Sequence, residues 1–161
     1  MKLWVYQYLE EKMAMTFLQM ANAAMEKAQA VDAADAINIL TDNPDALLVD
    51  VRDEAEVFVT GIGNRAINAP GRSIAWKADA EPDNEWREPE LQDRGRKILT
   101  TCGMSPCYRG AKAANLLTKM GFTDVSYVEG GMTALLDAGM PVVAPGKDTQ
   151  AEEIGKRQLS A

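Results

Sequence analysis

The chain contains no histidine among its 161 residues. Histidine is the general base of Cys-His and Ser-His-Asp catalysis and the commonest protein ligand of metal ions. Its absence excludes these forms of nucleophilic catalysis and every histidine-ligated metal site. A nucleophile in this chain must therefore be activated by other groups.

Cysteine is also scarce, because Cys102 and Cys107 are the only two. Two cysteines are too few to hold a structural zinc ion by themselves. Two cysteines in one loop also cannot form the disulfide framework that stabilises a small secreted fold. We therefore expect no metal, no cofactor, and a reducing, cytoplasmic environment.

Basic residues are outnumbered, since 17 Lys and Arg stand against 24 Asp and Glu and give a net charge of −7. Binding to a phosphate backbone favours clustered Lys and Arg, whereas these are scattered among acids. We expect no nucleic-acid partner.

Long apolar runs are missing as well. The uncharged stretch over residues 13–25 contains Thr16, Gln19 and Asn22, and a membrane-spanning helix needs about 20 apolar residues. Charged residues at positions 10–12 interrupt the apolar start of the chain, which argues against an export signal. We expect neither a membrane span nor secretion.

The length and the hydrophobic fraction of 47% suit one globular domain. We expect an N-terminal amphipathic helix over residues 1–29, a folded domain over 30–143 and a polar tail over 144–161. The helix either packs on the domain or forms a homodimer or partner interface. Apolar residues fall on one of its faces: Val5, Leu9, Met13, Phe17, Met20, Ala24 and Ala28.

From residue 31, short apolar runs alternate with helical patterns. Asp32 can cap a helix that ends near Leu40, and the continuous apolar run over 46–51 is typical of a strand buried on both faces of a parallel sheet. The alternation predicts an α/β fold, with a mainly parallel sheet flanked by helices. Further strands are expected over 66–68, 97–101 and 125–128, and further helices over 54–59, 109–120 and before Gly139.

Residues 71–95 are expected to form a long irregular surface excursion. Trp76 and Trp86 either pin it to the body or line a mouth over the site. Arg72 is interpreted as lining that mouth or as a solvated side chain.

The segment Cys102-Gly-Met-Ser-Pro-Cys-Tyr-Arg109 lies between an expected strand and an expected helix. Unpaired N–H groups and the positive end of the dipole meet at a helix N-terminus, and both stabilise an anion such as a thiolate. In parallel sheets, sites lie beyond the carboxyl ends of the strands. This loop is therefore the candidate site.

Several motifs together resemble the single-domain rhodanese family, which has a three-layer sulfurtransferase fold. The resemblance covers about residues 31–143 and even the excursion after Pro70. Its motifs are Leu48-Val-Asp-Val-Arg52 with Glu56, Thr60-Gly-Ile62, Ala66-Ile-Asn-Ala-Pro70, Arg109-Gly-Ala-Lys-Ala-Ala114, Gly121-Phe122, Val128-Glu-Gly-Gly131 and Ala138-Gly-Met-Pro-Val142.

The resemblance implies a bacterial-type enzyme in which Cys102 takes a sulfane sulfur from a donor such as thiosulfate and holds it as a persulfide. The sulfur then passes to a thiol or cyanide-type acceptor, or to a sulfur-carrier protein. Arg109 is expected to hold an anionic donor, or alternatively to pack against a carboxylate. Substrate contacts are expected from the rest of the loop: Gly103, Met104, Ser105, Cys107, Tyr108 and Gly110.

The loop departs from the family in its length. Most members space the nucleophile and the arginine as C-x4-R, whereas Cys102 and Arg109 form C-x6-R. A wider loop either admits a bulkier donor or disrupts the ring of backbone N–H groups that would stabilise an anionic sulfur. The alternative function is therefore a catalytically silent module that binds a partner through its N-terminal helix and enlarged loop; a phosphatase is a weaker interpretation.

Cys102 is the expected nucleophile, because it ends the strand. Cys107 has three interpretations: a cysteine without a role, a resolving thiol, or the true sulfur carrier. Arg52 and Glu56 are expected to form a scaffold ion pair beside Asp50, and Gly130 with Gly131 a backbone bend.

Overall fold

The computed structural model describes residues 14–143, and a parallel sheet forms its centre. The strand order is β1-β6-β5-β2-β4, and every neighbouring pair is parallel. The predicted α/β fold with a mainly parallel sheet is confirmed. The strands are β1 (Gln29–Val31), β2 (Leu47–Asp50), β4 (Ile67–Asn68), β5 (Ile98–Thr101) and β6 (Val125–Val128).

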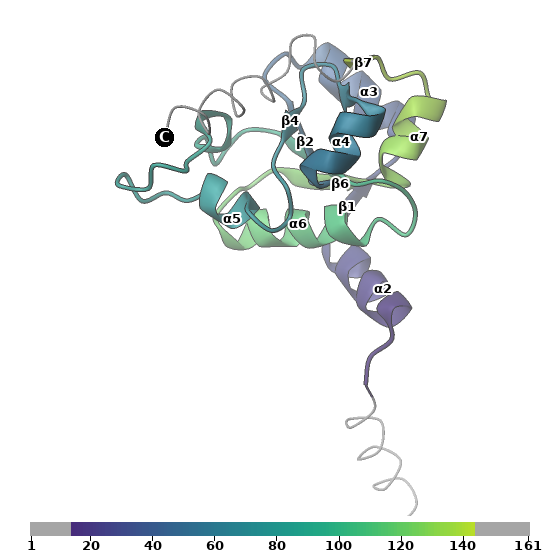
Figure 1. Cartoon of the computed structure of the whole chain (residues 1–161), viewed down its shortest axis with the longest axis horizontal. Coiled ribbons are helices and arrows are strands. Elements are labelled where there is room, and N and C mark those ends of the chain that lie inside the picture. Colours follow the sequence, from purple (N-terminus) through teal and green to yellow (C-terminus); the bar gives the residue numbers. More distant parts are fainter. Residues whose placement is uncertain (1–13, 144–161) are drawn as a thin grey trace, which may run out of the picture.

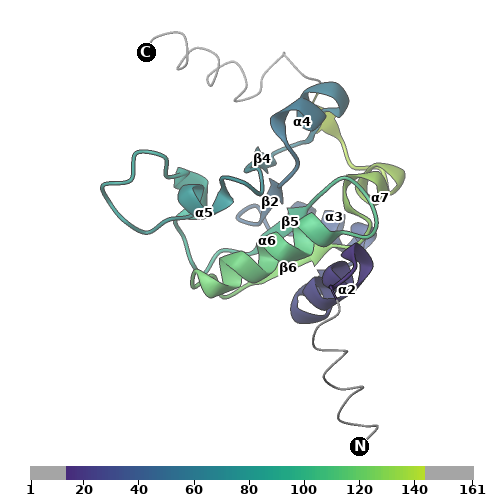
Figure 2. The same ribbon diagram turned by 60° about the horizontal axis from the view of Figure 1, so that its bottom comes forward.

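Helices cover both faces of the sheet (Figures 1 and 2). One face carries α2 (Phe17–Lys27), α5 (Ile74–Lys77) and α6 (Tyr108–Lys119), and the other carries α3 (Ala33–Asp42) and α7 (Gly131–Asp137). The remaining helix, α4 (Glu54–Thr60), follows β2 directly. The three layers expected from the sequence are therefore present.

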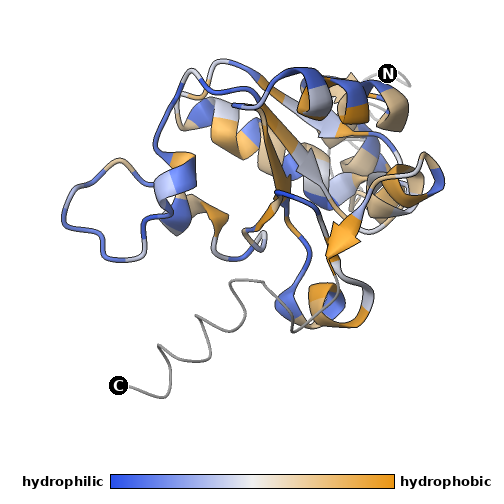
Figure 3. Ribbon diagram, turned by 90° about the horizontal axis from the view of Figure 1, so that it is seen from above, coloured by the Kyte–Doolittle hydropathy of each residue, from blue (hydrophilic) through white to orange (hydrophobic). Residues whose placement is uncertain are grey.

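Side chains of the central strands alternate between two hydrophobic clusters. Leu47 and Val49 of β2 face the α6 side, and Leu48 between them faces α3 and α7. All four residues of β2 are buried, as the continuous apolar run predicts for a central strand. Figure 3 shows hydrophobic colour in the central strands and a mostly hydrophilic loop beyond α5.

Three short strands were not predicted from the sequence. The strand β3 (Ile62–Gly63) pairs antiparallel with β7 (Val142–Val143) in a separate sheet. The edge strand β1 pairs with β6, in a stretch predicted as the end of a helix. Runs of two or three residues are too short to show the alternation that identifies a strand.

The predicted N-terminal helix is not continuous within the described residues. Thr16 caps α2 through a capping box with Gln19, and the chain is not helical over residues 14–16. The prediction of one continuous helix over residues 1–29 is therefore wrong at residues 14–16. Residues 1–13, with the predicted apolar positions Val5, Leu9 and Met13, lie outside the described residues.

The buried face of α2 is also shifted from the predicted one. Phe17 and Met20 are 58% and 42% exposed, whereas Ala21 is fully buried. Ala24 and Met25 pack against the core on the α6 side, and the Ala24 carbonyl accepts a hydrogen bond of 2.9 Å from Asn115 of α6. Within the described residues, α2 therefore packs on the domain.

The excursion over residues 71–95 is held by aliphatic residues, and the expectation that the tryptophans pin it is wrong. Trp76 and Trp86 are 66% and 74% exposed, whereas Ile74, Ala78 and Leu91 are buried. Leu91 ends a short 3-10 helix, η1 (Pro89–Leu91). The excursion is thus anchored at α5 and at η1.

A buried ion pair ties the end of β2 to the end of α4. The Arg52 guanidinium donates to both Asp50 carboxylate oxygens at 2.6–3.1 Å, and its other contacts are Thr60 Oγ1 at 2.6 Å and the Gly61 carbonyl at 2.9 Å. Neither charged side chain is more than 5% exposed. The predicted Arg52–Glu56 pair is wrong, because Glu56 pairs with Arg109.

The variant Asp50→Asn is expected to destabilise the fold by about 3–5 kcal/mol, because it leaves the buried Arg52 charge without its counter-ion. Urea denaturation of wild type and variant measures this difference. The control Arg72→Ala removes exposed ion pairs with Asp53 and Glu54 and is expected to have a far smaller effect. Equal losses in the two variants would contradict the role assigned to Asp50.

Candidate active site

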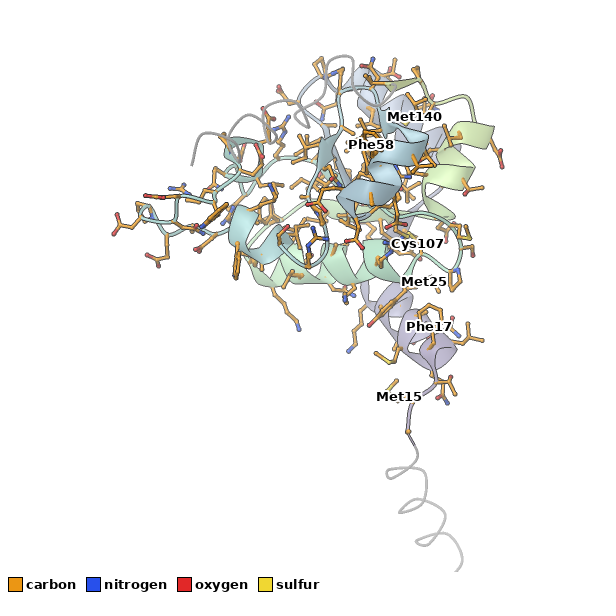
Figure 4. The ribbon with its side chains drawn as sticks, in the orientation of Figure 1. Met15, Phe17, Met25, Phe58, Cys107 and Met140 are labelled. Atoms are coloured by element: carbon orange, nitrogen blue, oxygen red, sulfur yellow. The ribbon has the colours of Figure 1, made fainter. Side chains whose placement is uncertain are left out.

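The two cysteines lie at the two ends of one loop at the carboxyl edge of the sheet. Cys102 directly follows β5, and Cys107 is the N-cap of α6. Figure 4 labels Cys107 where α6 begins, and Phe17 and Met25 on α2. The predicted position of the loop, between a strand and a helix N-terminus, is confirmed.

The two thiol sulfurs face each other beneath the loop. Cys102 Sγ lies 2.8 Å from Cys107 Sγ, and both thiols are free. The residues are 2% and 1% exposed. The loop thus buries a dithiol in direct contact.

Cys107 stabilises the thiolate of Cys102. The hydrogen bond from Cys107 is the main influence that lowers the pKa of Cys102 to about 7, against the opposing effect of burial. The Gly110 N–H, the Arg109 charge and the Met104 N–H lower it further. The same hydrogen bond, together with burial, raises the pKa of Cys107 well above its usual range. Cys102 is therefore the thiol of the pair that ionises more readily, and Cys107 is the one that donates the hydrogen bond.

Two glycines make the close packing of the loop possible. A Cβ on Gly110 would lie 2.7 Å from Cys107 Sγ, and a Cβ on Gly131 would lie 2.5 Å from the Cys102 carbonyl oxygen. Gly130 and Gly131 have φ of +74° and +62°, so the predicted backbone bend is confirmed. The bend lets the Met132 N–H donate to the Cys102 carbonyl at 2.7 Å.

Arg109 is held by Glu56 of α4. Two hydrogen bonds of 2.6 and 2.8 Å join the guanidinium to the two carboxylate oxygens. These bonds are the main reason that the pKa of Glu56 falls to about 2, and they raise the pKa of Arg109. Arg109 was expected to hold an anionic donor or to pack against a carboxylate, and the structure provides the carboxylate. That carboxylate is Glu56, which was predicted to pair with Arg52.

The other predicted contact residues divide between two surfaces. Met104 is 67% exposed and Ser105 is exposed, whereas Gly110 is buried under the loop. Gly103 is half-buried, and its carbonyl accepts from the Thr133 N–H at 3.0 Å. The outer face of the loop is thus open to solvent, and its inner face holds the sulfurs.

Tyr108 makes a contact that the sequence did not indicate. Its ring meets Phe17 of α2 edge-on, with 5.6 Å between centroids. Tyr108 is the first residue of α6 and follows Cys107 directly. No signal in the sequence pairs these two rings, because they lie far apart in the chain.

A cavity of about 140 Å³ lies beside the loop, and three basic side chains line it: Arg72, Arg109 and Lys112. Its lining includes Asp53 but, among the described residues, neither cysteine. Arg72 also pairs with Asp53 and Glu54. Arg72 is thus an exposed side chain that lines this cavity, and that it lines a mouth over the cysteines stays a prediction.

Within residues 14–143, no group of three or more cysteine, aspartate and glutamate side chains is placed to bind a metal ion. No helix in the same range is long and apolar enough to span a bilayer.

Most of the chain matches one known protein family. The model of the rhodanese-like domain matches residues 32–138. No curated protein matches the chain.

Three solved structures are similar to the chain over most of its length. A polysulfide-sulfur transferase homodimer from Wolinella succinogenes is 26% identical with a TM-score of 0.65, and the match covers 84% of this chain and 93% of that chain. A protein of unknown function from Rhodopseudomonas palustris, described as a possible tyrosine phosphatase, is 25% identical with a TM-score of 0.69, covering 82% and 97%. A rhodanese-like domain protein from Staphylococcus aureus is 25% identical with a TM-score of 0.54, covering 72% and 99%.

Replacing Cys107 by alanine is expected to raise the pKa of Cys102 above about 7, because it removes the hydrogen bond that lowers that pKa most. The measurement is the rate of Cys102 alkylation by iodoacetamide across a pH series, since only the thiolate reacts. The Cys107→Ser variant keeps a donor and is expected to titrate between the other two. An unchanged midpoint in Cys107→Ala would contradict this account.

The Glu56–Arg109 pair is expected to contribute less than about 1 kcal/mol to stability, because the pair is partly exposed. Glu56 has a folded pKa of about 2 against an ordinary value of 4.5. Its contribution is therefore complete above about pH 4.5 and is lost as the pH falls toward 2. Urea unfolding of wild type and Glu56→Gln at several pH values should show a difference that shrinks in acid. A difference that grows in acid would contradict the pairing.

Proposed function

Because the chain belongs to the rhodanese-like domain family, we propose that it is a sulfurtransferase that carries a sulfane sulfur on Cys102. The observation that supports Cys102 most directly is its position directly after β5, at the start of the loop that leads into α6. The pKa of Cys102 is about 7, and its sulfur lies by the N-terminus of α6 with the Gly110 and Met104 N–H groups. Backbone dipoles and a neighbouring thiol thus do what a histidine does in other cysteine enzymes.

The proposed reaction has two steps. The Cys102 thiolate attacks the outer sulfur of thiosulfate, the bond between the two donor sulfurs breaks, and sulfite leaves with the electron pair. The product on the enzyme is the anion Cys102–S–S⁻. A thiol or cyanide-type acceptor then attacks the outer sulfur and restores the Cys102 thiolate. A sulfur-carrier protein is the larger acceptor that the same chemistry serves.

The donor is proposed to be a small sulfur anion. Arg72, Arg109 and Lys112 meet in the cavity beside the loop, where Asp53 is the acidic group of the lining. Polysulfide is a second donor of this class, and the similarity to the Wolinella succinogenes transferase supports it. Because Cys102 is only 2% exposed, entry of a donor requires displacement of residues 103–106.

A silent binding module is the competing function. Two observations favour it. Cys102 is buried, and both terminal guanidinium nitrogens of Arg109 donate to Glu56. In that case the exposed outer face of the loop, which includes Met104, is the partner surface.

A homodimer through the N-terminal helix remains a proposal. Phe17 and Leu18, at the start of α2, are 58% and 57% exposed, which supports contact with a second copy. The burial of Ala21 against the domain supports the packing interpretation for the opposite side of the helix.

Incubating the reduced protein with thiosulfate is expected to add one sulfur atom, visible by intact-mass spectrometry. We expect the gain in wild type at early times and in Cys107→Ser, because both keep the Cys102 nucleophile. We expect none in Cys102→Ser, whose hydroxyl is not ionised at neutral pH.

Circular dichroism of each variant controls for folding. A gain that vanishes only in Cys107→Ser would assign the sulfur to Cys107 instead. No gain with thiosulfate, polysulfide or mercaptopyruvate in any cysteine-containing form would favour the silent module.

A further inference from the structure

We propose that Cys107 is a resolving thiol that attacks the Cys102 persulfide and releases its outer sulfur as sulfide. The inference rests on the proposed function, because the persulfide is its starting species. It adds a second outcome to the site, since sulfur leaves as sulfide when no acceptor takes it. The protein would then act as a reductase of sulfane sulfur as well as a transferase.

The position of Cys107 supports this role first. Its sulfur is 2.8 Å from Cys102 Sγ, and both residues are at most 2% exposed. An external acceptor must displace the loop to reach the persulfide, whereas Cys107 is already beside it. Holding two reactants in contact replaces a bimolecular step with an intramolecular one, which is worth several orders of magnitude in rate.

The fold, rather than a loose loop, brings the sulfurs together. The Cys102 carbonyl is fixed by the Met132 N–H of α7 at 2.7 Å, and the Cys107 carbonyl accepts from the Ala111 N–H at 3.0 Å as α6 begins. Gly110 supplies the space, because any side chain there would meet Cys107 Sγ. Each cysteine is thus anchored by a separate helix.

The additional length of the loop fits the same role. In C-x6-R, the second cysteine lies two residues before Arg109 and becomes the N-cap of α6. The four intervening residues allow the chain to turn back so that the two sulfurs meet. The departure from the family spacing therefore adds a second sulfur nucleophile and leaves Cys102 at the end of β5.

The step balances without an external oxidant. A bond forms between the two Sγ atoms, and the bond from Cys102 Sγ to the outer sulfur breaks. The outer sulfur takes the electron pair and is reduced to sulfide, the two cysteine sulfurs are oxidised to a disulfide, and the Cys107 proton leaves on the sulfide as HS⁻. An external dithiol then reduces the disulfide. Over a cycle, thiosulfate and a dithiol give sulfite, sulfide and the oxidised dithiol.

A purely supportive role for Cys107 makes a different prediction. As a hydrogen-bond donor alone, it lowers the pKa of Cys102 but never forms a bond to it. Serine preserves a donor at this position and removes the thiol, whereas alanine removes both. The pair Cys107→Ser and Cys107→Ala therefore separates resolution from support.

The test uses anaerobic, fully reduced protein with thiosulfate and no added thiol or cyanide. We expect wild type to release about one equivalent of sulfide per chain and to form a Cys102–Cys107 disulfide, detected by peptide mapping after alkylation. We expect Cys107→Ser to retain the added sulfur and to release sulfide at least roughly tenfold more slowly. Wild type without thiosulfate is the control for oxidation by other routes.

Wild type that holds its persulfide as long as Cys107→Ser, with no disulfide and no sulfide, would overturn the inference while leaving the proposed function intact. No sulfur gain in Cys107→Ser and neither sulfide nor disulfide in wild type would overturn the proposed function itself. If the variants fail to fold, the intact mass of wild type, together with its sulfide and disulfide, decides between these outcomes.

Discussion

The contact between the two sulfurs is the interaction on which the site depends. It lowers the pKa of Cys102 to about 7 and raises that of Cys107, so one contact favours the thiolate of Cys102 and keeps Cys107 protonated. Burial disfavours a thiolate. In a chain without histidine, the neighbouring thiol and backbone N–H groups have to offset that cost. The surrounding structure allows this close approach. Gly110 leaves space for Cys107 Sγ, Gly131 leaves space for the Cys102 carbonyl, and α6 begins at the loop.

The short helix α4 connects the buried framework to the loop through two carboxylate–arginine pairs. At its C-terminal end, Arg52 joins Thr60 and Gly61 to Asp50 of β2. One turn earlier, Glu56 of α4 holds Arg109 of α6. The orientation of Arg109 therefore depends on a helix that is itself fixed by a pair at most 5% exposed. A disturbance at Asp50 would be expected to reach the loop by this route.

The sequence predicted the sheet and the place of the loop because both follow from local patterns. The apolar run over 46–51 and the cap at Asp32 each have a direct physical signature. The partners of the charged side chains were less predictable. Arg52 and Glu56 lie only four positions apart in the sequence, which suggested a pair between them, but Glu56 binds Arg109, 53 positions away. The exposed tryptophans and the Phe17–Tyr108 contact likewise depend on packing between distant segments. The start of α2, by contrast, has a local signature in the capping box of Thr16 and Gln19.

The edge strand β1 gives the segment before residue 32 a protective role in the sheet. β1 pairs along β6 from Gln29 to Val31, and α2 leads directly into it. A fragment limited to the matched family region, residues 32–138, would lack both elements. The buried strand β6 would then become the outer strand, with backbone groups free to pair with another molecule, and such edges promote aggregation. The residues that precede the family region therefore replace the four-residue buried edge of β6 with the shorter edge of β1.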